Sequence, residues 1–146
     1  MIPHWINGQR VLVAAAGDIR IYELATGRET RVTADGQSAF PAWHANGSIA
    51  YTSSRSEREG YSNVWFLPPS GKSGAVRLTQ LEGQVDVDSW SPDGRTLAVH
   101  HHKPREGNSD VLMIGVEEGR SPEPQSFAAV PTLQQTSAAF SPDGRY

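Results

Sequence analysis

The hexapeptide Trp-Ser-Pro-Asp-Gly-Arg at residues 90–95 returns at residues 140–145, with Phe in place of Trp. Its Pro suits the second position of a type I turn, its Asp side chain bonds nearby backbone, and its Gly accepts a positive φ. An aromatic residue precedes each turn, and after residue 95 an apolar run follows. Residues 43–47 and, more weakly, 5–8 carry Asn-Gly in the same slot. The pattern therefore predicts a series of tight β-hairpins.

The chain also repeats over a longer distance. The segment Arg58–Val64 (REGYSNV) returns as Arg105–Val111 (REGNSDV), 47 residues later, and Trp43 and Trp90 share the same spacing. A period between about 20 and 50 residues is typical of an array of small structural units. We therefore expect several consecutive β units of similar build.

Each unit is predicted to hold four strands. The third spans residues 80–127, with strands at 87–90, 96–101, 110–116 and 124–127. The second spans 34–79, with strands at 40–43, 48–53, 63–67 and 75–79. The first, 1–33, is shorter, with strands at 10–16, 19–24 and 31–33, and a partial fourth, 128–146, opens with a strand at 136–140. No segment has helical periodicity, so we predict an all-β propeller of four-stranded antiparallel blades.

These residues resemble a known family. The turn at 90–95 followed by Leu-Ala-Val at 97–99, and Asn-Val-Trp-Phe at 63–66 before Arg-Leu-Thr at 77–79, are similar to the WD-like repeat of TolB-type β-propellers. The resemblance implies a non-catalytic scaffold for protein interaction or ligand sensing, in a periplasmic or other extracytoplasmic location. Such repeats also occur beside bacterial serine/threonine kinase domains and in prolyl oligopeptidase-like and tricorn-like proteases. The alternative is thus a propeller that regulates an enzyme domain.

Composition excludes several other classes. The net charge is −3, and the Lys and Arg residues are scattered, which argues against a nucleic-acid partner. The longest apolar run, residues 11–16, is too short to span a bilayer, and no segment resembles a signal peptide. The absence of Cys excludes disulfides and leaves the compartment open.

No catalytic site is predicted. Gly-Lys-Ser at 71–73 lacks the glycine that a phosphate-binding loop needs five positions earlier, where Phe66 stands, and no helix follows. The same segment lacks the second glycine of a nucleophile elbow. We expect no cofactor and no turnover by this chain alone.

Two pairs of side chains have the chemistry of metal ligands. His100 and His102 share one face of a strand, as do Asp86 and Asp88. Two imidazoles suit zinc only with further ligands, and two carboxylates suit calcium or magnesium only with further oxygens. The spacing identifies no such partners, so the sequence predicts no metal site and favours solvated or hydrogen-bonded side chains.

The loops that join the second and third strands of each blade should emerge beside the linkers between blades. Loops on a rigid scaffold often carry binding residues. The candidate binding residues on this loop face are Arg55, Arg58, Glu59, Lys103, Arg105 and Glu106. They predict a protein or peptide partner, although solvated charges around a structural glycine give the same pattern.

Closed propellers hold about four to eight blades, whereas this chain supplies three and the opening of another. We therefore expect it to be part of a longer protein, or to close a ring with a second copy. Uncovered apolar end faces predict self-association. Deletion of residues 132–146 is expected to favour a discrete dimer.

Overall fold

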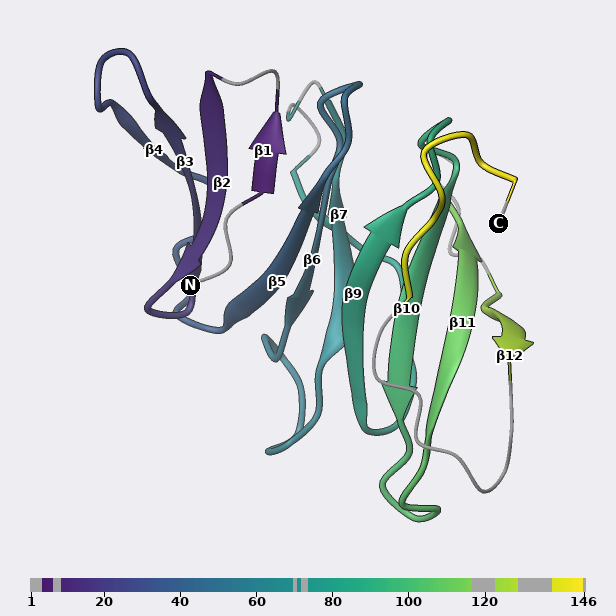
Figure 1. Cartoon of the computed structure of the whole chain (residues 1–146). Helices are drawn as coiled ribbons and strands as arrows, with labels where there is room; N and C mark the ends of the chain where they lie inside the picture. The colour runs from purple at the N-terminus through teal and green to yellow at the C-terminus, as the bar shows by residue number, and fades with distance from the viewer. Residues whose placement is uncertain are drawn as a thin grey trace.

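The computed structural model describes residues 4–6, 9–69, 71, 74–116, 123–128 and 138–145. All regular structure in these residues is β, arranged as three four-stranded antiparallel sheets (Figure 1). None of the described residues forms a helix suited to crossing a membrane. The predicted all-β fold is confirmed.

The three sheets follow one another along the chain. The first contains β1 (His4–Ile6), β2 (Arg10–Ala15), β3 (Asp18–Glu23) and β4 (Glu29–Arg31). The second contains β5 (Ser38–Trp43), β6 (Ile49–Ser53), β7 (Asn63–Leu67) and β8 (Val76–Arg77). The third contains β9 (Gln84–Trp90), β10 (Thr96–His102), β11 (Ser109–Gly115) and β12 (Gln125–Ala128). Within each sheet the strands pair in sequence order, so each sheet is a simple meander.

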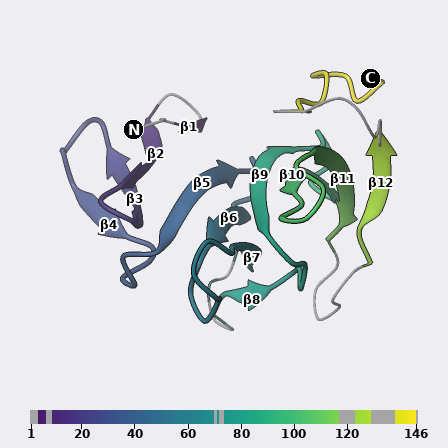
Figure 2. The same ribbon diagram turned by 90° about the horizontal axis from the view of Figure 1, so that it is seen from below.

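The sheets are arranged as successive blades. The first strand of each sheet contacts the first strand of the next, β1 with β5 and β5 with β9. The later strands of each sheet lie progressively farther from this inner row, as the view along the blades shows (Figure 2). This radial arrangement of four-stranded meanders is that of a β-propeller.

The predicted turn chemistry is confirmed between β9 and β10. The Asp93 carboxylate accepts hydrogen bonds from the Ser91 hydroxyl at 2.6 Å and from the Arg95 backbone N–H at 3.0 Å. Gly94 has a φ of 70°, and its N–H donates to the Ser91 carbonyl at 2.9 Å. Residues 141–145 repeat these bonds. The turn therefore depends on residues adjacent in the chain, which is why its sequence predicts it.

Apolar side chains fill the space between neighbouring blades. On β6, Ile49 and Tyr51 pack with Leu12 of β2, whereas Ala50 packs with the third sheet. Alternate residues of one strand thus serve two different interfaces. The Trp90 indole N–H crosses the second interface and donates to the Ala42 carbonyl at 3.0 Å. Because both faces of the middle sheet are covered, its β6 strand is buried along its whole length.

The predicted strand at 136–140 falls partly outside the described residues. Its described part, residues 138–140, has no strand assignment but lies against the third blade. The Ala138 N–H donates to Asp88 at 3.0 Å, and the Phe140 N–H donates to Ser89 at 3.2 Å. This segment thus contacts β9 through the side chains of Asp88 and Ser89.

Candidate functional site

Asp86, Asp88, His100 and His102 form a single cluster on the third blade. His100 lies opposite Asp86 in the β9–β10 ladder. The register shifts at Ala98 and Val99, which pair with Ser89 and Val87, so Asp88 is the extra residue of a bulge. The bulge allows both carboxylates to reach the same imidazole. The structure therefore joins two pairs of residues that the sequence presented separately.

His100 lies between the two carboxylates. Its Nδ1 is 2.8 Å from Asp88 Oδ1, and its Nε2 is 3.4 Å from Asp86 Oδ2. Hydrogen bonds to Asp86 and then to Asp88 raise the pKa of His100 to about 9, against the opposing effect of burial. At neutral pH the ring is an imidazolium, with one N–H directed at each carboxylate.

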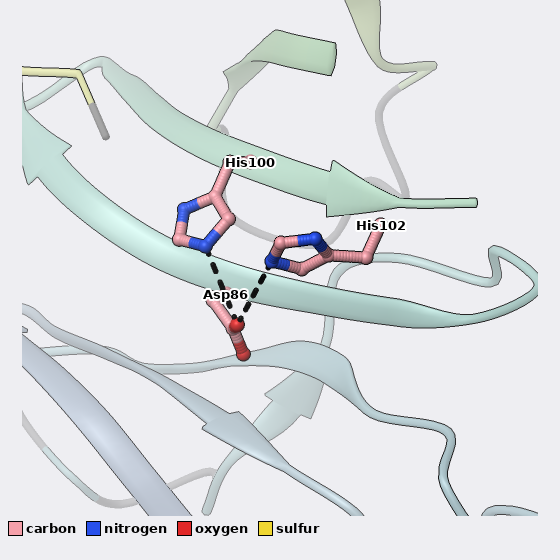
Figure 3. A group of neighbouring side chains, drawn as sticks. All are labelled: Asp86, His100 and His102. Carbon is pink, nitrogen blue, oxygen red and sulfur yellow. Dashed lines mark ion pairs between the residues drawn. The ribbon is translucent and has the colours of Figure 1, made fainter. Parts of the chain in front are cut away.

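His102 lies next to His100 and is directed at the same Asp86 oxygen (Figure 3). Its Nε2 is 3.9 Å from Asp86 Oδ2, while its Nδ1 is hydrogen-bonded to the Ser109 hydroxyl. The side chains of His100 and Asp86 are 12% and 13% exposed, and that of His102 is 34% exposed. The cluster is therefore enclosed at one end and open to solvent at His102.

His101 takes no part in this cluster. It lies between His100 and His102 on β10, so its side chain points to the opposite face. Its Nε2 contacts the Glu82 carbonyl at 2.6 Å. The three consecutive histidines thus divide into two cluster members and one residue that contacts the linker before β9.

The six candidate loop-face residues have different environments. The Arg55 guanidinium lies 3.9 Å from the Trp65 ring centroid, and that of Arg58 lies 5.4 Å from Tyr61. The Lys103 ammonium contacts Glu106 at 3.0 Å and Asp110 at 2.7 Å. Glu59 and Arg105 are exposed. Arg55, Arg58 and Lys103 thus each contact residues of their own loop or blade.

A groove of about 860 Å³ lies between the first and second blades. Its aromatic and apolar lining includes Trp43, Tyr51 and Leu67. The charged residues that line it, within the described part of the chain, are Arg10, Arg31, Arg55 and Asp35. The Arg10 guanidinium lies 4.8 Å from the Trp43 ring centroid, so cationic groups are stacked on aromatic ones beside this groove. Sequence analysis identified Arg55 but not the groove, because two blades must pack together to create it.

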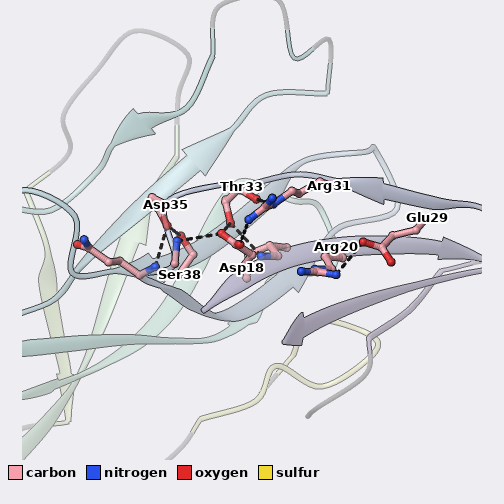
Figure 4. A network of polar contacts seen from close by, with 10 residues as sticks. Asp18, Arg20, Glu29, Arg31, Thr33, Asp35 and Ser38 are labelled. Atoms are coloured by element: carbon pink, nitrogen blue, oxygen red, sulfur yellow. Dashed lines mark hydrogen bonds and ion pairs between the residues drawn. The ribbon is translucent and has the colours of Figure 1, made fainter. Parts of the chain in front are cut away.

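A polar network fixes the chain where it leaves the first blade (Figure 4). The buried Asp18 carboxylate binds Arg31, the Thr33 hydroxyl and the Gly36 N–H. The Thr33 hydroxyl also accepts from the Ile19 N–H at 2.9 Å. This network positions residues 32–35, which line the groove.

The second blade repeats this arrangement. The Thr79 hydroxyl donates to Asn63 Oδ1 at 2.7 Å and accepts from the Val64 N–H at 2.9 Å. Arg31 and Arg77 each donate through Nε to the carbonyl of the Thr two positions later. Sequence reasoning missed the network, although Arg-x-Thr at 31–33 and 77–79 was its visible signal.

Comparison with known proteins finds similarity to β-propeller proteins. No family model matches the chain. A TolB homolog of Chlorobium chlorochromatii is 39% identical over 80 residues, which cover 55% of this chain and 17% of that protein. The structure of a TolB candidate from Agrobacterium tumefaciens matches with a TM-score of 0.79 at 19% identity, covering 98% of this chain and 50% of that one.

TolB from Acinetobacter baumannii matches with a TM-score of 0.72 at 17% identity, covering 99% of this chain and 36% of that one. Protease structures, among them the propeller domain of a Pyrococcus furiosus protease, are similar in fold at lower TM-scores. The chain thus spans half or less of the length of the TolB relatives it matches.

The three radially arranged meanders define the chain as part of a β-propeller. Among propellers it resembles the TolB type, both in the sequence match and in the fold of the two TolB structures. The resemblance drawn from the turn and strand motifs is thereby confirmed.

Proposed function

We propose that this chain is a non-catalytic propeller module that binds an acidic segment of a protein partner in the groove between its first two blades. The observation that carries the proposal is the groove's combination of Trp43, Tyr51 and Arg55. Trp, Tyr and Arg are the residues most enriched at the energetic centres of protein interfaces. The TolB likeness supports a protein partner over a small molecule.

The charge of the groove supports an acidic partner. Among the described residues, Arg10, Arg31 and Arg55 line it together with one carboxylate, that of Asp35, although the whole chain has a net charge of −3. Arg31 is already paired with Asp18. Arg10 and Arg55 therefore supply the cationic charge, each held over an indole ring. We assign Arg58 and Glu59, which belong to the same loop as Arg55, to the solvated rim of the groove, whereas Lys103, Arg105 and Glu106 belong to the third blade and do not line it.

The binding test uses two pools of fluorescein-labelled 12-residue peptides, one enriched in Asp and Glu and the other in Lys and Arg. Fluorescence anisotropy with the full chain should show saturable binding of the acidic pool only, weakened by added salt. The Arg55→Glu substitution should reduce this binding at least tenfold, since it reverses a charge that lines the groove.

The matched control is Arg105→Glu, which makes the same change in an exposed loop of the third blade. It should leave the affinity within about twofold of the unsubstituted chain. Equal losses in the two variants would mean non-specific attraction, and preference for the basic pool would refute the proposal.

The second candidate is a propeller that gates a catalytic domain, and the fold likeness to protease propellers supports it. The TM-scores of 0.57 to 0.60 for those structures, against 0.79 and 0.72 for the TolB structures, favour the first candidate. Sequencing on either side of the coding region discriminates between them. A hydrolase or kinase domain in the same reading frame would support the gating role.

We further propose that the isolated chain self-associates through its end blades and that the protein works outside the cytoplasm, as the TolB likeness suggests. Light scattering should show species larger than a monomer, with a discrete dimer enriched after deletion of residues 132–146. A monomer at high concentration in both forms would contradict self-association. Cell fractionation tests the location.

A further inference from the structure

We propose that Asp86, His100 and His102 bind a divalent ion of a late first-row transition metal, for which Zn²⁺ is the probe. The site lies on the third blade, away from the groove, so the inference goes beyond the proposed function and stands independently of it. One carboxylate oxygen and two imidazole nitrogens make a ligand set suited to such metals.

The three ligand atoms are already close to coordinating positions. They all lie within 4.8 Å of one another. Asp86 Oδ2 is 3.4 Å from His100 Nε2 and 3.9 Å from His102 Nε2. Zinc bonds to nitrogen and oxygen of about 2.0–2.2 Å place neighbouring ligands of a tetrahedron roughly 3.3–3.6 Å apart. Small side-chain rotations, without movement of the strands, therefore bring the set to coordinating distances.

The second nitrogen of each imidazole is already fixed. His100 Nδ1 is 2.8 Å from Asp88 Oδ1, and His102 Nδ1 is bonded to the Ser109 hydroxyl. Metal-binding histidines almost always hold their other ring nitrogen in this way, which sets the tautomer and directs Nε2 at the metal. Solvated histidines at a strand end need no such partners, so the sequence-based expectation of no metal site gives way to this proposal.

Charge and access also suit a divalent cation. Asp86 and Asp88 carry two negative charges, which balance the charge of the ion when both imidazoles are neutral. The exposed edge of His102 provides the entry path, and three protein ligands leave a fourth position for water.

The test is titration of the full chain with Zn²⁺ by isothermal calorimetry, and with Co²⁺ by visible absorption. We expect one saturable site and the intense visible bands of tetrahedral Co²⁺, which zinc displaces. His102→Ala removes a partly exposed ligand and should abolish both signals. Ser109→Ala removes only a supporting hydrogen bond and should weaken binding about 10- to 100-fold.

The matched control is His101→Ala, which removes the neighbouring histidine from the opposite face of β10 and should leave binding unchanged. Circular dichroism of each variant checks that the fold persists. Zinc binding that survives His102→Ala, or that His101→Ala removes equally, would overturn the proposal. Failure of the unsubstituted chain to bind Zn²⁺ at micromolar concentrations would also overturn it, whatever the folding of the variants.

Discussion

At the residue scale, buried carboxylates and amides fix the ends of strands by bonding groups from distant parts of the chain. Asp18 shows this most clearly. Its carboxylate joins Arg31 at the end of β4 to the Gly36 N–H in the linker that leads to β5. Asn63 has the same task in the second blade, where it accepts from the Leu81 N–H at 3.0 Å. A single side chain thus orients the path from one blade to the next.

The Asp18→Asn substitution should flatten the acid dependence of stability. The hydrogen bond from Arg31, followed by that from the Gly36 N–H, lowers the pKa of Asp18 below its ordinary value of 3.8. The folded chain therefore binds this proton less readily than the unfolded chain. The stabilisation is fully present above pH 3.8 and is lost as the pH falls through the lower folded-state pKa.

Urea unfolding between pH 6 and pH 2.5 measures this effect. The unsubstituted chain should lose stability more steeply in acid than Asp18→Asn, which should be the less stable of the two near neutral pH. Identical slopes for the two chains would show that Asp18 contributes nothing to acid unfolding.

At the element scale, the third and fourth strands of a blade are joined by the repeated Thr network as well as by the ladder. β8 has only two residues, and β4 has three. Strands this short make few ladder bonds. The Thr33 and Thr79 hydroxyls supply further bonds just beyond them, to the Ile19 and Val64 N–H groups. The attachment of the outer strand in each of these blades therefore depends on a Thr side chain as well as on backbone hydrogen bonds.

The Thr79→Val substitution should destabilise the chain by about 1–3 kcal/mol, because it leaves the buried Val64 N–H and Asn63 Oδ1 without this partner at nearly constant volume. The matched control is Thr30→Val on β4, an exposed strand position where the change should stay within about 0.5 kcal/mol. Free energies of unfolding from urea titration measure both. Equal costs at the two positions would contradict a structural role for the Thr79 network.

At the scale of the whole molecule, the blades cohere through the side chains that lie between them. Trp43 and Trp90 occupy equivalent positions before their turns, yet their indole N–H groups have different environments. The Trp90 indole N–H binds the Ala42 carbonyl of the preceding blade, and its ring meets Phe66 edge-on at a centroid distance of 6.0 Å. The Trp43 indole N–H is buried without a hydrogen-bond partner among the described residues.

Replacement of each Trp by Phe should separate these two roles. Trp90→Phe leaves a buried carbonyl of the neighbouring blade without its donor and should cost about 1–3 kcal/mol beyond the lost contact area. Trp43→Phe removes a buried N–H that has no described partner, so its cost should be smaller. Thermal and urea unfolding of the two variants give the comparison. A larger loss for Trp43→Phe would contradict the assigned coupling between the second and third blades.

The sequence by itself determined the turns, the β character of the chain and the repeated blade, because each depends on residues within a few positions of one another. The Ser-Pro-Asp-Gly turns bond internally, and strand alternation follows from the two-residue period. Strand limits were less accurate: β9 begins at Gln84, not at the predicted residue 87, because Val85 pairs with His101.

Only the tertiary structure decided which side chains meet. Asp88 joins His100 because of a bulge in the β9–β10 register, and Arg55 and Trp43 share a groove because two sheets pack together. The sequence pattern placed the two aspartates on one face and the two histidines on another strand, with no relation between them. Register and packing arise from the summed contacts of whole strands. Local spacing therefore identified the candidate residues, while the folded arrangement brought them together as sites.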